Sequence, residues 1–116
     1  MGPIQRVLAD EKLQSFVGQE VYLHLETTNG AYAGNNPSGG MAVCAYIRNV
    51  KVKFSRASIT GLGPYRAGMK MDGGWIYAEG LTDWEETPDG KLLFAGYDNE
   101  GRLAVSLEIS KTPFRV

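Results

Sequence analysis

The chain has few of the residue types that mark particular protein classes. Among its 116 residues there is one cysteine, Cys44, and one histidine, His24. These counts exclude an internal disulfide and a zinc site built from cysteines and histidines. No segment approaches the roughly 20 consecutive apolar residues of a membrane helix. We therefore expect a soluble protein of the reducing cytoplasm, with no membrane contact.

The chain also has no large excess of positive or of negative charge. Twelve basic and thirteen acidic residues leave a net charge of −1, which excludes broad attraction to nucleic acid or to anionic lipid. The first twelve residues show no apolar run that would predict a signal peptide, and Arg6 stands where a myristoylation signal needs Ser or Thr. The length predicts a single domain over residues 1–116, large enough to fold around one core.

Only the beginning of the chain has helical periodicity. Apolar residues are spaced i, i+4, i+7 and i+8, and these are Ala9, Leu13, Phe16 and Val17. The polar residues between them are Glu11, Lys12 and Gln14. This pattern predicts one short amphipathic helix, and Gly18 is a natural residue to end it.

After Gly18 the period changes to 2, which predicts strands. We expect them at residues 21–28, 41–54, 57–60, 65–71, 74–84, 91–97 and 102–110, and the turn at residues 98–101 joins the last two as a hairpin. Within residues 41–54 the apolar positions change parity at Arg48 and Asn49, which predicts a β-bulge. Residues 29–40 are rich in glycine and predict a loop.

Five segments of the chain resemble the YojF family of small bacterial proteins. They are VYLHLETT at 21, AYIRNVKV at 45, GPYRAGMKM at 63, GWIYAEGLT at 74 and SLEISKTPF at 106. The resemblance implies an all-β fold with one short N-terminal helix, in which a mainly antiparallel, bifurcated sheet is partly folded upon itself. It implies a source among bacteria of the bacillus type. The family has no established activity, but its members are often encoded beside a deacetylase of bacillithiol biosynthesis, which by association makes that enzyme a candidate partner.

The first candidate site is the polar face of residues 21–28. Alternation places Tyr22, His24 and Glu26 on one face, where an imidazole and a carboxylate lie about 7 Å apart. A metal would need two more ligands, and the conceivable ones are Cys44, Asp72, Glu79 and Asp83. The Pro-Cys-x-x-Cys that accompanies His-x-Glu in zinc deaminases is absent. We expect no metal and no cofactor, and a half-exposed His24 hydrogen-bonded across strands.

The second candidate site is aromatic and basic. Trp75, Tyr77 and Glu79 alternate with Ile76, Ala78 and Gly80, and Arg66 follows a Gly-Pro turn. Further aromatic and basic residues of this kind are Tyr46, Arg48, Tyr65 and Trp84. Such a face is either core or a platform for a small ligand or a protein. An aromatic face left over in a domain of this size is most simply covered by a second copy, which predicts a homodimer.

Three functional hypotheses follow. The leading one is a non-enzymatic accessory protein, in which the groups Tyr22/His24/Glu26 and Arg66/Trp75/Tyr77 meet a small ligand or a protein partner. The second is a small enzyme in which His24 is a general base oriented by Glu26. No sequence motif supports a catalytic pair of Cys44 and His24. Cys44 lies between the apolar residues Val43 and Ala45, so we expect its side chain to pack as a small hydrophobic group. The third is a purely structural homodimer through the polar strand face.

Overall fold

The computed structural model describes residues 1–28 and 44–115, without the side chain of Cys44. One helix and nine strands are described there. Their bounds are β1 (Gly2–Pro3), α1 (Arg6–Gln14), β2 (Glu20–Thr28), β3 (Cys44–Lys53), β4 (Arg56–Thr60), β5 (Tyr65–Met71), β6 (Gly74–Leu81), β7 (Asp83–Glu86), β8 (Leu92–Tyr97) and β9 (Leu103–Ser110). The predicted loop at residues 29–40 and the beginning of the strand predicted from residue 41 lie outside the described residues.

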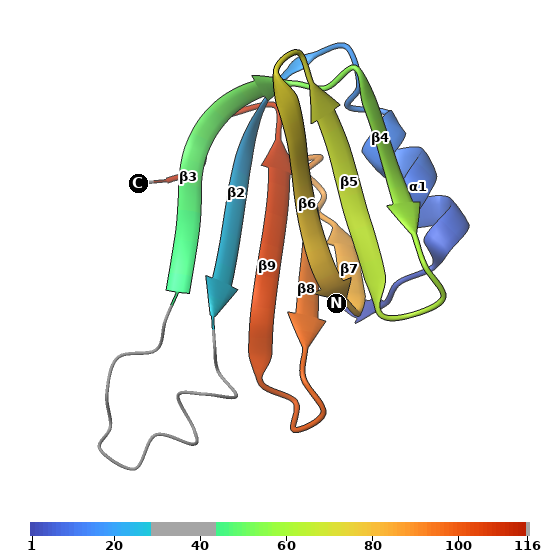
Figure 1. Cartoon of the computed structure of the whole chain (residues 1–116). Coiled ribbons are helices and arrows are strands. Elements are labelled where there is room, and N and C mark those ends of the chain that lie inside the picture. The colour runs from blue at the N-terminus through green and yellow to red at the C-terminus, as the bar shows by residue number, and fades with distance from the viewer. Residues whose placement is uncertain (29–43, 116) are drawn as a thin grey trace.

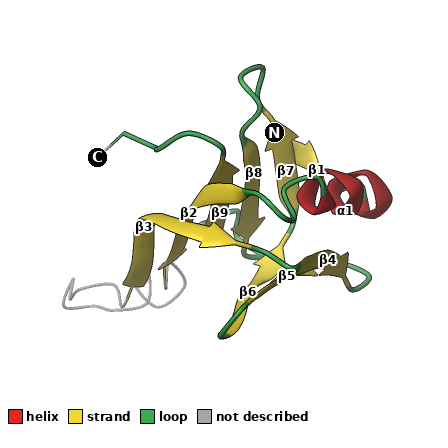
Figure 2. Ribbon diagram, turned by 90° about the horizontal axis from the view of Figure 1, so that it is seen from above, coloured by secondary structure: helices red, strands yellow, loops and turns green. Residues whose placement is uncertain are grey.

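Two antiparallel sheets form the fold. The larger has the order β1-β7-β8-β9-β2-β3 and the smaller the order β4-β5-β6, and Figure 1 shows the smaller sheet in front of the larger one. Seen from above in Figure 2, the two sheets diverge from a common region, with α1 beside β4. The predicted all-β fold with one short helix and a bifurcated, antiparallel sheet is confirmed.

The core lies between the sheets. In most of the longer strands, inward-pointing residues are buried at alternate positions, as the periodicity predicts. From the larger sheet these include Leu23, Phe94, Leu107 and Ile109, and from the smaller sheet Ile59, Ala67, Met69 and Ala78. Phe54, between β3 and β4, is also fully buried, and it lies where the chain passes from the larger sheet to the smaller.

The helix is shorter than its apolar pattern predicts. Ala9 and Leu13 face the core, but α1 ends at Gln14, so Phe16 and Val17 belong to the turn that follows. Gly18, which the sequence predicts as the residue that ends the helix, instead lies in the turn beyond the helix end, where its φ is 81°. The Asp10 carboxylate accepts a hydrogen bond from the backbone N–H of Ile59 at 2.7 Å. The helix thereby closes the open edge of β4.

The prediction of one continuous strand at residues 74–84 is wrong, because this segment contributes to two strands, β6 and β7. β6 belongs to the smaller sheet and β7 to the larger, and the chain changes sheets at Thr82. The change follows Gly80, whose φ of 78° is readily reached only without a Cβ. The short strand β1, which pairs with β7, was not predicted because two residues show no periodicity.

The hairpin and the bulge are confirmed. β8 and β9 pair on either side of residues 98–101. In the β2–β3 ladder, Leu23 pairs with Val50 and Leu25 with Ile47, so Arg48 and Asn49 together face His24. Asn49 has a φ of 56°, which Asn tolerates better than most residues. In the described residues we find no helix long and apolar enough to cross a membrane.

Candidate functional site

His24 is buried, contrary to the half-exposed position expected from the sequence. It lies on β2, on the outer face of the larger sheet, opposite Glu108 of β9, and its relative exposure is only 7%. Its Nε2 atom lies 4.0 Å from Glu26 Oε2 and 3.9 Å from Glu108 Oε2. Alternation therefore placed His24 on the correct face, but that face is not open to solvent at this position.

The C-terminal segment covers His24. The Phe114 ring lies 6.5 Å from the imidazole, centroid to centroid, and the Arg48 guanidinium lies over the same ring at 5.4 Å. The Asn49 side chain accepts a hydrogen bond from the backbone N–H of Phe114 at 2.6 Å and donates one to its carbonyl at 2.7 Å. Arg48 also donates to the carbonyl of Arg115. The bulge on β3 thus holds residues 114–115 in place.

Both nitrogens of His24 lie near charged side chains. Arg48 Nη1 lies 3.4 Å from His24 Nδ1, and a guanidinium can only donate, so Nδ1 is the acceptor in this contact. Nε2 lies on the side of the ring that faces the carboxylates of Glu26 and Glu108. The imidazole is therefore enclosed by charged side chains of the chain itself and by Phe114.

The other members proposed for this site do not complete it. Tyr22 is half-buried and lies opposite Ser110 and Lys51 in the sheet. Across the described ranges, no group of three or more His, Cys, Asp or Glu residues could hold a metal ion. The side chain of Cys44 is not described, so its expected packing stays a prediction.

The second candidate site lies on the outer surface of the smaller sheet. Trp75 and Tyr77 of β6 are 42% and 49% exposed, whereas Ala78, which points to the opposite face of the strand, is buried. Their rings are stacked, with centroids 5.4 Å apart and an interplanar angle of 5°. Arg66 of β5 lies over Tyr77 at 5.1 Å and forms an ion pair with Glu79. The aromatic side chains form a platform and not a core.

Two further cations join this surface. In the strand register Arg56 of β4 pairs with Lys70 of β5, and Lys70 pairs with Trp75. The Arg56 guanidinium lies 5.4 Å and the Lys70 ammonium 5.9 Å from the Trp75 ring centroid. We define the aromatic face as Arg56, Arg66, Lys70, Trp75, Tyr77 and Glu79. The period-2 pattern places Arg56 on one side of its strand, but only the register reveals that it adjoins Trp75.

Gly68 explains how the rings lie on the sheet. It pairs with Tyr77, and a Cβ on Gly68 would approach the Tyr77 ring to 3.1 Å. The missing side chain lets the Tyr77 ring lean over β5. Arg66 precedes Gly68 by two residues on β5, and Trp75 precedes Tyr77 by two residues on β6. The Tyr77 ring therefore has Arg66 and Trp75 as neighbours within the molecule.

The structure does not bring the two candidate groups together. His24 is on the outer face of the larger sheet and Trp75 on the outer face of the smaller sheet, so the core separates them. Trp84, which the sequence pattern grouped with these residues, is on β7 and stacks on Phe94 at 6.5 Å. The two groups therefore cannot line one pocket.

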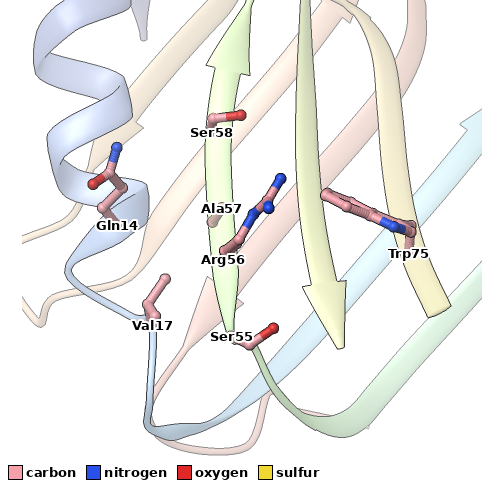
Figure 3. Close-up of a pocket in the computed structure, with 7 residues that line it drawn as sticks. All are labelled: Gln14, Val17, Ser55, Arg56, Ala57, Ser58 and Trp75. Atoms are coloured by element: carbon pink, nitrogen blue, oxygen red, sulfur yellow. The ribbon is translucent and has the colours of Figure 1, made fainter. Parts of the chain in front are cut away.

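A hollow of about 330 Å³ adjoins the aromatic face. Its lining residues are Gln14, Val17, Ser55, Arg56, Ala57, Ser58 and Trp75. Figure 3 shows Arg56 extending from β4 toward Trp75, with Gln14 and Val17 on the helix side. A second hollow, of about 480 Å³, is lined by Lys53, Phe54, Ser55, Lys70, Met71 and Asp72. His24 lines neither of them.

Fold and surface together define a small β protein of two divergent antiparallel sheets, with one covering helix and an exposed aromatic and basic sheet face. The chain belongs to the family described as "Protein of unknown function (DUF1806)", which matches residues 3–114.

Its relatives agree with this assignment. It is 49% identical over 104 residues to "Uncharacterized protein YojF" of Bacillus subtilis (strain 168), and 90% of each chain is covered. It is also similar to the crystal structure of the Bacillus subtilis YojF protein, with a TM-score of 0.83 and 44% identity, over 98% of this chain and 96% of the other. The resemblance read from the sequence is confirmed.

Proposed function

We propose that the protein is a non-enzymatic accessory protein that binds a partner protein through the aromatic face. The observation that carries the proposal is the stacked pair of Trp75 and Tyr77, exposed on a sheet and flanked by Arg56, Arg66 and Lys70. Tyrosine, tryptophan and arginine dominate the binding energy of protein interfaces, because they bury large areas and keep a polar group. An ordered aromatic pair loses little further side-chain entropy when a partner covers it.

The enzymatic alternative has less support. A general base needs a free nitrogen within reach of a substrate, whereas His24 is covered by Phe114 and contacts Arg48, Glu26 and Glu108. A small ligand remains an alternative occupant of the aromatic face, in the hollow beside Trp75. The polar strand face is a poor interface for a purely structural homodimer, because the chain's own C-terminal segment covers part of it.

The candidate partner is the deacetylase of bacillithiol biosynthesis. It comes from the family association alone, and no residue of this chain selects it.

A cytoplasmic location belongs to the same proposal and rests on the single cysteine of the sequence, which suits a reducing compartment. Fractionation of cells that carry the chain at its natural level tests the location directly.

Co-purification tests the partner and the surface together. We expect the tagged chain to retain the untagged deacetylase, and the double variant Trp75→Ala/Tyr77→Ala to lose it while staying folded. Tyr97→Ala is the matched control, because Tyr97 is 41% exposed and lies on the larger sheet. Failure of the unaltered chain in both tag orientations removes the deacetylase as partner. Equal retention by the double variant rejects the aromatic face.

A homodimer is the second candidate, and the edge of β3 favours it. β3 ends the larger sheet in the described part of the chain, and Tyr46 and Ile47, which point to opposite faces, are both exposed. An open strand edge with apolar side chains is a template for pairing with another strand. Sedimentation equilibrium should show a dimer that Ile47→Lys dissociates. A monomer at high micromolar concentration would reject this candidate.

A further inference from the structure

One end of the aromatic face carries uncompensated positive charge. At the other end, Arg66 is paired with Glu79. Arg56 and Lys70, the two cations over Trp75, form no ion pair with any residue in the described ranges, and neither does Lys53. The positive charge is therefore concentrated around Trp75 and Ser55, in a chain whose net charge is −1.

The three cations line two adjoining hollows. Arg56 lines the hollow of about 330 Å³, and Lys53 and Lys70 line the one of about 480 Å³. Both hollows include Ser55, so they adjoin where β3 passes into β4. Asp72 is the one carboxylate in either lining. The three cations thus follow a surface track that passes Ser55.

We infer that this track, which we call the Ser55 track, binds an acidic polypeptide segment of the partner, with carboxylates on Lys53, Arg56 and Lys70 and apolar contact on Trp75. The inference rests on the proposed function, and it adds the chemistry of the segment that docks. The cation–π contact with Trp75 orients the Arg56 guanidinium before binding, and its N–H groups match a carboxylate. Arg56 and Lys70 are direct cross-strand neighbours, and side chains on one face of an extended peptide recur about every 7 Å, so one acidic segment presents several carboxylates to the track.

Two other anionic ligands fit less well. A small anion such as phosphate contacts one or two of the cations, because they line different hollows. Single-stranded nucleic acid binds through bases that stack on free aromatic faces. Here Trp75 and Tyr77 stack on each other, and Arg66 lies over Tyr77, so part of each ring is already covered from within the molecule.

Titration with a deca-glutamate peptide tests the inference. The chain has two tryptophans, so a Trp84→Phe background leaves Trp75 as the only indole, and its fluorescence reports binding at the track. The comparison probes are deca-glutamine, sodium phosphate and an oligothymidylate. The test variant is Arg56→Gln/Lys70→Gln. The control is Arg6→Gln/Lys111→Gln, which removes the same charge at exposed positions elsewhere.

We expect deca-glutamate to bind, to weaken at least about tenfold in Arg56→Gln/Lys70→Gln, and to weaken with rising salt. The control should bind as the unaltered chain does, and deca-glutamine should not bind. Absence of peptide binding, or an equal loss in both variants, overturns the inference. Phosphate or the oligothymidylate binding more tightly than the peptide also overturns it.

The result can be separated from that of the proposed function. If the deacetylase is captured through Trp75 and Tyr77 but the peptide does not bind, the inference fails and the proposed function stands. If the peptide binds at the track but no partner is captured, the track stands and the partner must be sought elsewhere.

Discussion

A Cβ atom on Gly96 would lie 2.1 Å from the carbonyl oxygen of Gly80. Gly96 is in β8 of the larger sheet and Gly80 is in β6 of the smaller sheet. This contact lies just before Thr82, where the chain returns from one sheet to the other. The bifurcated fold therefore depends on a glycine at position 96, because no other residue leaves room for the two backbones.

Gly96→Ala should be strongly destabilising. The added methyl group meets backbone of β6 and also a methyl group of Val105 at 2.5 Å, so relief requires the sheets to separate. We expect a loss of about 3 kcal/mol or more in the free energy of unfolding, measured by urea denaturation. Gly73→Ala is the control, since a Cβ there meets nothing within 4 Å, and it should change the value by less than about 0.5 kcal/mol. Similar stability of the two variants would contradict the close approach.

Gly68→Ala should separate the geometry of the aromatic face from stability. The new Cβ comes within 3.1 Å of the Tyr77 ring, which is exposed and can move aside. We expect less than about 1 kcal/mol of lost stability, but a clear change in the near-ultraviolet circular dichroism of the stacked Trp75–Tyr77 pair. Partner binding should weaken in parallel. An unaltered spectrum would mean that Tyr77 does not lie over Gly68.

Phe114→Ala should expose His24. Phe114 is buried and packs on His24 and Arg48, so its truncation should cost about 3 kcal/mol. Arg115→Ala is the control, because Arg48 contacts the carbonyl and not the side chain of residue 115. In nuclear magnetic resonance spectra the imidazole signals of His24 should shift in Phe114→Ala alone. Unchanged signals would show that the C-terminal segment does not cover His24 in solution.

Asp98 should make stability depend on pH. The backbone N–H of Arg102 donates to its carboxylate, and this hydrogen bond, with those from Glu100 N–H and the Arg102 side chain, holds the pKa of Asp98 below its ordinary value of 3.8. A carboxyl group with a lowered pKa in the folded state contributes stability above its unfolded pKa and loses it as the pH falls through the folded value.

Asp98→Asn should therefore be less stable than the unaltered chain at about pH 7, and the difference should shrink below about pH 4. Urea denaturation across this range measures it. Asp72→Asn, in the turn between β5 and β6, is the control, because Asp72 makes no side-chain hydrogen bond to the described residues. A difference that grows toward low pH would contradict the assignment.

The period-2 pattern alone determined which side chains share a face of a strand. Trp75 and Tyr77 were predicted opposite Ile76 and Ala78, and the structure confirms this because successive residues of a pleated strand point to opposite sides. The bulge at Arg48 and Asn49 was predictable for the same reason, since a change of parity requires an extra residue.

What surrounds those faces was decided by the tertiary structure. The burial of His24 comes from Phe114, near the other end of the chain, and the cations beside Trp75 come from strands paired through the register of the smaller sheet. The division of residues 74–84 between two sheets depends on the approach of Gly80 to Gly96. Local alternation is fixed by backbone geometry, whereas these contacts join residues distant in sequence, and their choice depends on how the whole core packs.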